Sequence, residues 1–171
     1  FLIDYFQVPK DTTESANWDL RSDAVELRNA SFQLRNHYSE QTAIGIDYKD
    51  LDVRKINLLV NKIRIDVDTI YGNVAQLNCF ENRGFYLKDF SGNAKVSSKE
   101  LKVDELHIQT ATSQLDLDLH YTYNHWSDYL HFIDSVRMDY TFQPSVINFN
   151  DVAFFAPALS GLKEKLSVSG R

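Results

Sequence analysis

The sequence is poor in the residues that mark disulfide-linked, metal-binding or membrane-spanning proteins. Its 171 residues include one cysteine, five histidines, three prolines and six glycines. A single thiol cannot form an internal disulfide, and no Cys-x-x-Cys or closely spaced histidine pair predicts a zinc site. No apolar run approaches the roughly 18 residues of a membrane-spanning helix. The chain opens without an initiator methionine or a signal peptide, so we expect a piece of a longer protein.

The charge balance argues against two classes of partner. The formal net charge is -6, and 43% of the residues are hydrophobic while 25% are charged. An acidic surface offers no long-range attraction to nucleic acid or to anionic lipid headgroups, so we expect no nucleic-acid partner. The hydrophobic fraction is ordinary for a folded globular domain.

Alternation of polar and apolar residues dominates the chain. Residues 114–123 read QLDLDLHYTY, and successive side chains of an extended strand point to opposite faces. The alternation recurs in AIGIDY, KIRIDV, ELKVDELHI, ELRNASFQL, SVRMDYTF and SVINFNDVAFF. Its phase slips after Val103 and again at Asn29. We predict about ten to twelve short strands separated by polar turns.

Helical signals are few. Residues 124–136 carry apolar side chains at helical spacing, and residues 156–166 could hold one turn. Residues 10–17 contain capping residues without an apolar stripe, which predicts a mobile loop. Residues 61–70 and 99–108 align with each other, which suggests repeated β units stacked along one axis.

The polar positions of the strands carry the candidates for chemistry. Asp116 and Asp118, like Asp66 and Asp68, are two positions apart in the sequence, which places their carboxylates about 7 Å apart on one strand face. Glycosidases use carboxylate pairs at comparable separation. Here further polar residues flank each pair, which favours a solvated face that opposes aggregation. No nucleophile or phosphate-binding motif is present, so we expect no enzyme, cofactor or metal site.

The apolar side chains of the strands must be shielded from water, and three kinds of shield are considered. A second sheet would give a β-sandwich or a small barrel. A lipid bilayer would give an outer-membrane barrel, but charges such as Arg64 and Lys102 near strand centres and the absence of aromatic girdles argue against it. Lipid chains filling a long groove are the third cover. From the residues alone, the sandwich and the groove both stay open.

Four segments together resemble a known family. They are ANWDLRSDAVELRNASFQL, AIGIDYKDLDVRKINLLVNKIRID, ENRGFYLKDFSGNAKVSSKELKVDELHIQTATSQLDLDLHY and INFNDVAFFAPALSGLKEKLSVSGR. Across residues 17–171 the chain is similar to the periplasmic repeat region of TamB-type proteins of the AsmA-like superfamily, in the variant typical of Bacteroidota. The resemblance implies an all-β fold in one segment over residues 1–171. It would be an elongated, curved, mostly antiparallel repeat sheet, open like a groove, with at most one or two short helices.

The resemblance also implies a function. Such proteins are anchored in the inner membrane of Gram-negative bacteria, and their periplasmic groove shields phospholipid acyl chains between the inner and outer membranes. They support outer-membrane protein assembly with an Omp85-family barrel (TamA or TamL type), whose contacts would lie outside this chain. The expected groove-facing residues are Ile44, Ile46, Ile63, Ile65, Leu101, Val103, Leu115, Leu117 and Leu119. The alternative is a β-sandwich module that binds glycans through Trp18, Trp126 and Tyr129.

Overall fold

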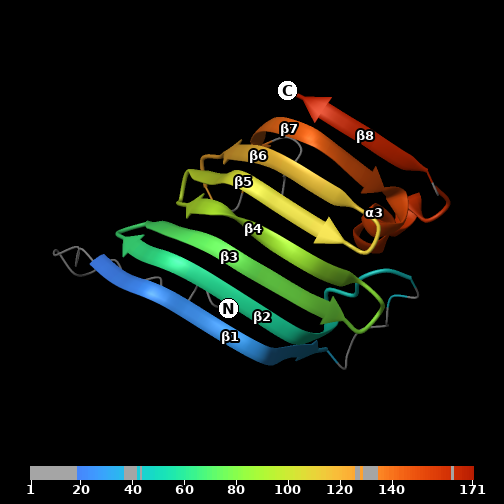
Figure 1. The fold of residues 1–171 in the computed structure, drawn as a ribbon, viewed down its shortest axis with the longest axis horizontal. Helices are drawn as coiled ribbons and strands as arrows, with labels where there is room; N and C mark the ends of the chain where they lie inside the picture. The colour runs from blue at the N-terminus through green and yellow to red at the C-terminus, as the bar shows by residue number, and fades with distance from the viewer. Residues whose placement is uncertain (1–18, 37–41, 43, 126–127, 129–134, 163) are drawn as a thin grey trace.

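The described part of the chain is one antiparallel sheet. The computed structural model describes residues 19–36, 42, 44–125, 128, 135–162 and 164–171. Within them, eight strands form a sheet in which each strand pairs with its neighbours in sequence (Figure 1). The elements are β1 (Asp19–Arg35), β2 (Asp50–Asp66), β3 (Thr69–Glu81), β4 (Tyr86–Val96), β5 (Glu100–Thr110), β6 (Gln114–Thr122), β7 (Arg137–Asn148), α3 (Phe149–Phe155), η2 (Pro157–Leu159) and β8 (Lys165–Gly170). The sheet is open, with β1 and β8 at its edges, and the expected all-β antiparallel fold is confirmed.

The strands that the structure describes are longer and fewer than predicted, because bulges interrupt the alternation without ending a strand. β1 and β2 each contain 17 residues. The phase slips predicted at Asn29 and after Val103 are bulges, with register shifts and left-handed φ values of 49° at Asn29 and 54° at Glu105. Lys55 and Lys62 take the same conformation in β2. A bulge adds one extra residue to the strand. The apolar residues after it are therefore shifted by one position in the sequence and still point to the same face of the sheet.

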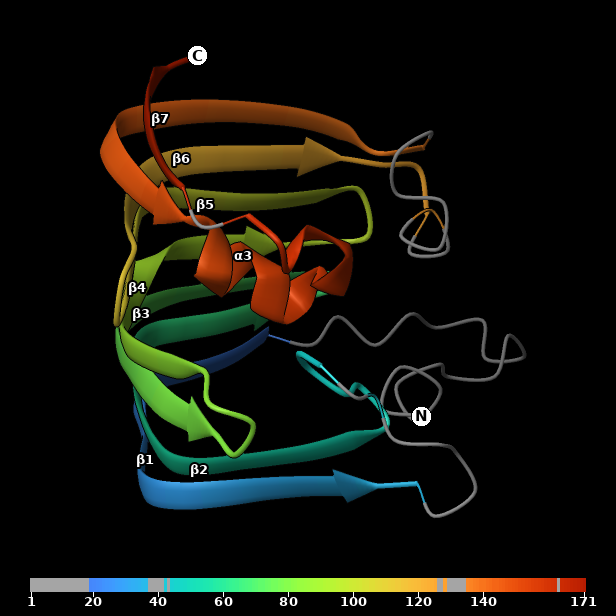
Figure 2. The ribbon, with the colours of Figure 1, turned by 90° about the vertical axis from the view of Figure 1, so that its right-hand side faces the viewer.

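The sheet is strongly curved, and Figure 2 shows its strands turning sharply so that two arms enclose a concave side. Two glycines lie where side chains of one face converge. A Cβ atom on Gly92 would lie 3.0 Å from Val103 Cγ1, and one on Gly72 would lie 3.1 Å from Val60 Cγ1. Glycine permits this close approach because it has no side chain. The face that carries Val60 and Val103 is therefore the inner face of the bend.

The strand predicted over AIGIDY is wrong. Gly45 has a φ of 77°, and residues 44–49 form bends and a turn before β2 begins. The buried Asp47 carboxylate accepts the backbone N–H of Lys49 at 3.0 Å, a side-chain contact that favours a turn over an extended chain. Ile44 and Ile46 consequently lie outside the sheet.

The strand predicted over SVINFNDVAFF ends early. β7 runs through Pro144 only to Asn148, and α3 follows at once. The Asn148 side chain accepts the backbone N–H of Asn150 at 3.0 Å, which satisfies one free donor at the helix N-terminus. This cap overrides the alternation of the sequence.

The remaining local predictions have mixed outcomes. The turn expected within residues 156–166 is present as η2. The two segments that align in sequence differ in structure, because residues 61–70 cross the turn from β2 to β3 while residues 99–108 reach from a turn into β5. The helix expected over 124–136 lies largely outside the described residues, and the loop expected over 10–17 lies wholly outside them.

Candidate functional site: an open apolar face between two polar rims

One face of the sheet is apolar from β1 to β7. Directly opposed residues of neighbouring strands point to the same face. One row of such partners comprises Leu20, Ile65, Ile70, Val96, Leu101, Tyr121 and Met138. The adjacent row comprises Gly72, Ala94, Val103, Leu119 and Tyr140. We call these two rows, with the cluster around Leu106 and Leu117, the apolar face.

Burial on the apolar face is uneven. Val103, Leu106 and Leu117 form its densest cluster, with exposed fractions of 8%, 3% and 6%. Leu20 and Ile70, by contrast, are 52% and 49% exposed. No large side chain among the described residues is fully buried, whereas a sandwich core encloses many. The described strands therefore leave much of the apolar face uncovered.

The structure brings seven of the nine expected groove residues onto the apolar face. These are Ile63 and Ile65 on β2, Leu101 and Val103 on β5, and Leu115, Leu117 and Leu119 on β6. The other two lie before β2. Ile44 is 60% exposed, and the Ile46 N–H donates to the Phe154 carbonyl at 2.8 Å.

Several residues of the apolar face were missed at the sequence level. Leu20, Tyr121, Tyr140 and Met138 belong to its two rows. Tyr121 continues the alternation of residues 115–119, so the pattern itself could have included it. The rows on the other strands required the register, which alternation does not supply.

The opposite face carries ion pairs between residues two positions apart. They are Asp19–Arg21, Glu26–Arg28, Asp52–Arg54, Arg64–Asp66, Lys102–Asp104 and Arg137–Asp139. Each pair brackets one apolar residue, and in an extended strand that residue points to the other face. Exposed ion pairs contribute little to stability because solvent screens them, so their main effect is solubility. An apolar residue between two residues of opposite charge is a sequence signal for this face that the prediction did not use.

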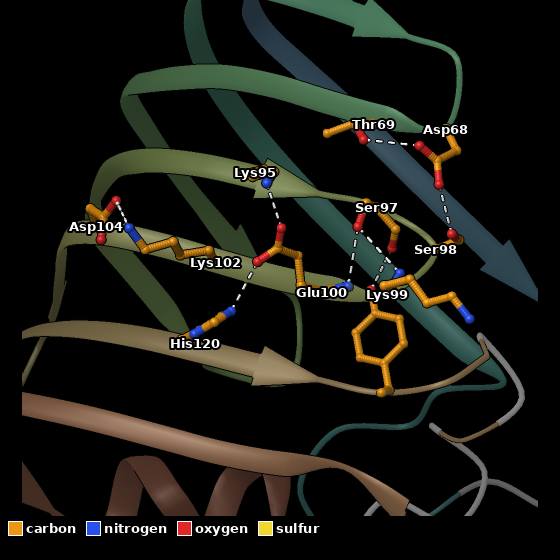
Figure 3. Close-up of polar contacts among 11 residues, drawn as sticks. Asp68, Thr69, Lys95, Ser97, Ser98, Lys99, Glu100, Lys102, Asp104 and His120 are labelled. Atoms are coloured by element: carbon orange, nitrogen blue, oxygen red, sulfur yellow. Dashed lines mark hydrogen bonds and ion pairs between the residues drawn. The ribbon is translucent and has the colours of Figure 1, made fainter.

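Carboxylates of the polar face are engaged across strands (Figure 3). Glu100 pairs with Lys95, and its second oxygen lies 2.9 Å from His120 Nε2. Asp116 Oδ1 lies 2.6 Å from His107 Nδ1. The Lys95 contact, with that of His120, holds the pKa of Glu100 below its usual range. The contact with His107 does the same to the pKa of Asp116.

The carboxylate pairs considered for catalysis are separated by their partners. Asp118 accepts the backbone N–H of Glu105 at 2.8 Å, whereas Asp116 contacts His107. Asp68 lies in the turn after β2, and the expectation that it shares a strand with Asp66 is wrong. These carboxylates therefore belong to the hydrogen-bonded polar face of the sheet.

The first polar rim of the apolar face is made of the turns that follow β2, β4 and β6. Ser98 Oγ donates to Asp68 Oδ2 at 2.7 Å, joining the first two turns (Figure 3). The Tyr123 hydroxyl donates to the Ser97 carbonyl at 2.7 Å, joining the third. Side chains thus join the three hairpin turns at this rim.

The second rim is built around α3, which Figure 2 places on the concave side of the sheet. Asp151 Oδ2 accepts three hydroxyls around the β5–β6 turn, from Thr110 at 2.6 Å, Thr112 at 2.7 Å and Ser113 at 2.5 Å. The two phenylalanines at the end of α3 lie against Phe85 after β3, with ring centroids 5.1 Å and 4.8 Å apart. One short helix therefore connects strand ends that are distant in sequence.

The fold and the face define the chain as an open, curved antiparallel sheet with one solvated and one apolar side. Comparison with known protein families, with curated proteins and with solved structures gives no match to this chain. No helix in the described ranges has the length and apolar character to cross a membrane. Within the same ranges, no three His, Cys, Asp or Glu side chains are grouped so that they could hold a metal ion.

Proposed function

We propose that this chain is a segment of a Gram-negative envelope protein that shields phospholipid acyl chains in the periplasm between the inner and outer membranes. The observation that carries the proposal is the apolar face, whose partner rows run from β1 to β7. No second sheet covers it in the described part of the chain. The sequence resemblance to TamB-type proteins supports the same function.

The dimensions of the apolar face suit an acyl chain. Neighbouring strands lie about 4.8 Å apart, so an eight-stranded sheet measures roughly 34 Å across its strands. The hydrocarbon core of a bilayer is about 30 Å thick, so one acyl chain needs roughly half of that length. Shielding contributes about 0.8 kcal/mol per CH₂, or roughly 12 kcal/mol for a chain of about 16 carbons before ordering costs. Apolar contact alone can hold such a chain without catalysis or a cofactor.

Two further parts of the proposal concern regions beyond this segment. The full-length protein would be anchored in the inner membrane. It would support outer-membrane protein assembly by contacting an Omp85-family barrel of the TamA or TamL type. Both follow from the resemblance, and neither assigns a residue here.

The glycan-binding alternative receives no support from the described residues. It requires a sandwich, whereas the described strands form one open sheet. Trp18, Trp126 and Tyr129, its expected ligand-binding side chains, lie outside the described residues.

Site-specific photo-crosslinking tests the proposal with matched neighbours. Met138 lies on the apolar face with 36% of the residue exposed, and the adjacent Asp139 lies on the polar face with 36% of its side chain exposed. A photoreactive amino acid at 138 should crosslink phospholipid in living cells, detected by mass spectrometry of the purified protein. The same amino acid at 139 should crosslink none. Ile70 and Tyr71 give a second pair across the sheet, with exposed fractions of 49% and 36%. Absence of lipid at 138 and 70, or equal labelling of both faces, would refute the shielding function.

A further inference from the structure

Two tyrosine hydroxyls meet on the otherwise hydrocarbon-rich apolar face. Tyr121 on β6 and Tyr140 on β7 have their hydroxyl oxygens 2.5 Å apart. Their rings meet edge to face, with centroids 5.6 Å apart, and the Tyr140 ring stacks on Phe142 at 5.8 Å. Tyr140 also packs against the cluster of Val103, Leu106 and Leu117. The hydroxyl pair is therefore held by packing on both strands.

The pair holds two protons, and only one of them lies between the two oxygens. When Tyr121 donates that proton, the Tyr140 hydroxyl points to Met138 Sδ at 3.6 Å. A thioether sulfur is a weak acceptor. An oxygen acceptor arriving on the apolar face would replace this contact with a stronger hydrogen bond.

The side chains around the pair become more polar along β6. Along β6, Leu117 and Leu119 come first and Tyr121 follows, and Tyr123 then bonds to the Ser97 carbonyl at the first rim. A hydrocarbon region thus passes through a hydroxyl pair to a polar rim. A diacyl glycerophospholipid has the same order of chemistry, from acyl chain through ester carbonyl to headgroup.

The geometry points to the Tyr121–Tyr140 pair as the site that receives an acyl-ester carbonyl of the bound lipid, with Tyr140 as the donor. This inference rests on the proposed function and deepens it. It makes the face selective for ester lipids over lipids of equal length that lack the carbonyl.

Lipid pairs that differ only in the carbonyl test this selectivity. Purified protein is equilibrated with vesicles that contain a trace of radiolabelled dioleoyl phosphatidylethanolamine or its dialkyl ether analogue, and the bound lipid is measured after flotation. One additional neutral hydrogen bond should make the ester lipid bind about fivefold more tightly than the ether lipid. Tyr140→Phe should remove the preference and leave ether binding unchanged. Tyr71→Phe, on the polar face, is the control and should keep the preference.

Each alternative outcome has a distinct meaning. Equal binding of both lipids by the unmodified protein, or a preference that survives in Tyr140→Phe and in Tyr121→Phe, would overturn the ester site while the shielding function stands. Failure to bind either lipid would overturn both proposals. A third arm uses palmitate: if Tyr140→Phe weakens palmitate binding and leaves ester binding intact, the pair recognises a free carboxylate, and the ester assignment is wrong.

Discussion

The tight bend that makes the apolar face concave can be tested with three glycine-to-alanine substitutions that separate two sources of strain. Gly92 combines a φ of 157° with a close contact, since its Cβ atom would lie 3.0 Å from Val103 Cγ1 and 3.3 Å from Leu106 Cα. Gly84 has a φ of 111°, but no atom of the described residues lies within 4 Å of the point that a Cβ would occupy. Gly72 has a close contact without backbone strain. Its Cβ atom would lie 3.1 Å from a valine methyl group, and its φ is not left-handed.

The expected costs differ accordingly. Gly84→Ala should lower the free energy of unfolding by about 1–2 kcal/mol through backbone strain alone. Gly72→Ala should cost about 0–2 kcal/mol, because overpacking is partly offset by the reduced entropy of the unfolded chain. Gly92→Ala should cost about 3–5 kcal/mol, because strain and overpacking add and the contacted atoms include backbone.

Urea unfolding followed by circular dichroism measures the three costs on one scale. The m-value should stay constant across the series, so that midpoints report stability. If Gly92→Ala costs no more than Gly84→Ala, then Val103 and Leu106 do not approach Gly92 closely. The sheet would then be flatter than described, and the reasoning that places the apolar face inside the bend would fail.

Three further predictions concern single contacts. Asp151→Asn should weaken the acceptor of three hydroxyls, costing about 1–3 kcal/mol and speeding hydrogen exchange of the α3 amides. Unchanged protection of the α3 amides would refute this role of Asp151. The stabilisation contributed by Glu100, whose pKa is depressed from 4.5 by Lys95 and His120, should be complete above that value and lost as pH falls through the lower folded pKa. In Glu100→Gln, the urea midpoint should fall less than that of the unmodified protein as the pH is lowered to about 3. An identical fall in both proteins would show that Glu100 does not contribute this stabilisation. Burial raises the pKa of the Cys79 thiol, so its reaction with an aromatic disulfide reagent near neutral pH should be slower in the folded protein than in urea, and equal rates would show an exposed thiol.

Local alternation predicted the strands well where both faces are chemically distinct. Residues 114–122 form β6 with its leucines on one face and its aspartates on the other, as QLDLDLHYTY indicates. The phase slips at Asn29 and after Val103 coincide with bulges in the structure, because a strand that gains one residue keeps its apolar side chains on the same face. The same reasoning failed at residues 44–48, where the turn around Asp47 outweighs the alternation.

The candidate site was only partly accessible from sequence. Ile63, Ile65, Leu101 and Val103 reach the apolar face because their own strands dictate it. The Tyr121–Tyr140 contact joins two strands, so it depends on a register that no single segment contains.

The sequence by itself determined which side chains share a face of each strand, because that property depends only on the geometry of neighbouring residues. It also determined that one face is solvated, through charged residues bracketing single apolar ones. The tertiary structure decided the rest: that the sheet curves and stays open, that Gly72 and Gly92 lie against valine side chains of neighbouring strands, and that α3 joins one rim. These features depend on contacts between residues far apart in the chain, whose balance of packing and strain cannot be read from local periodicity.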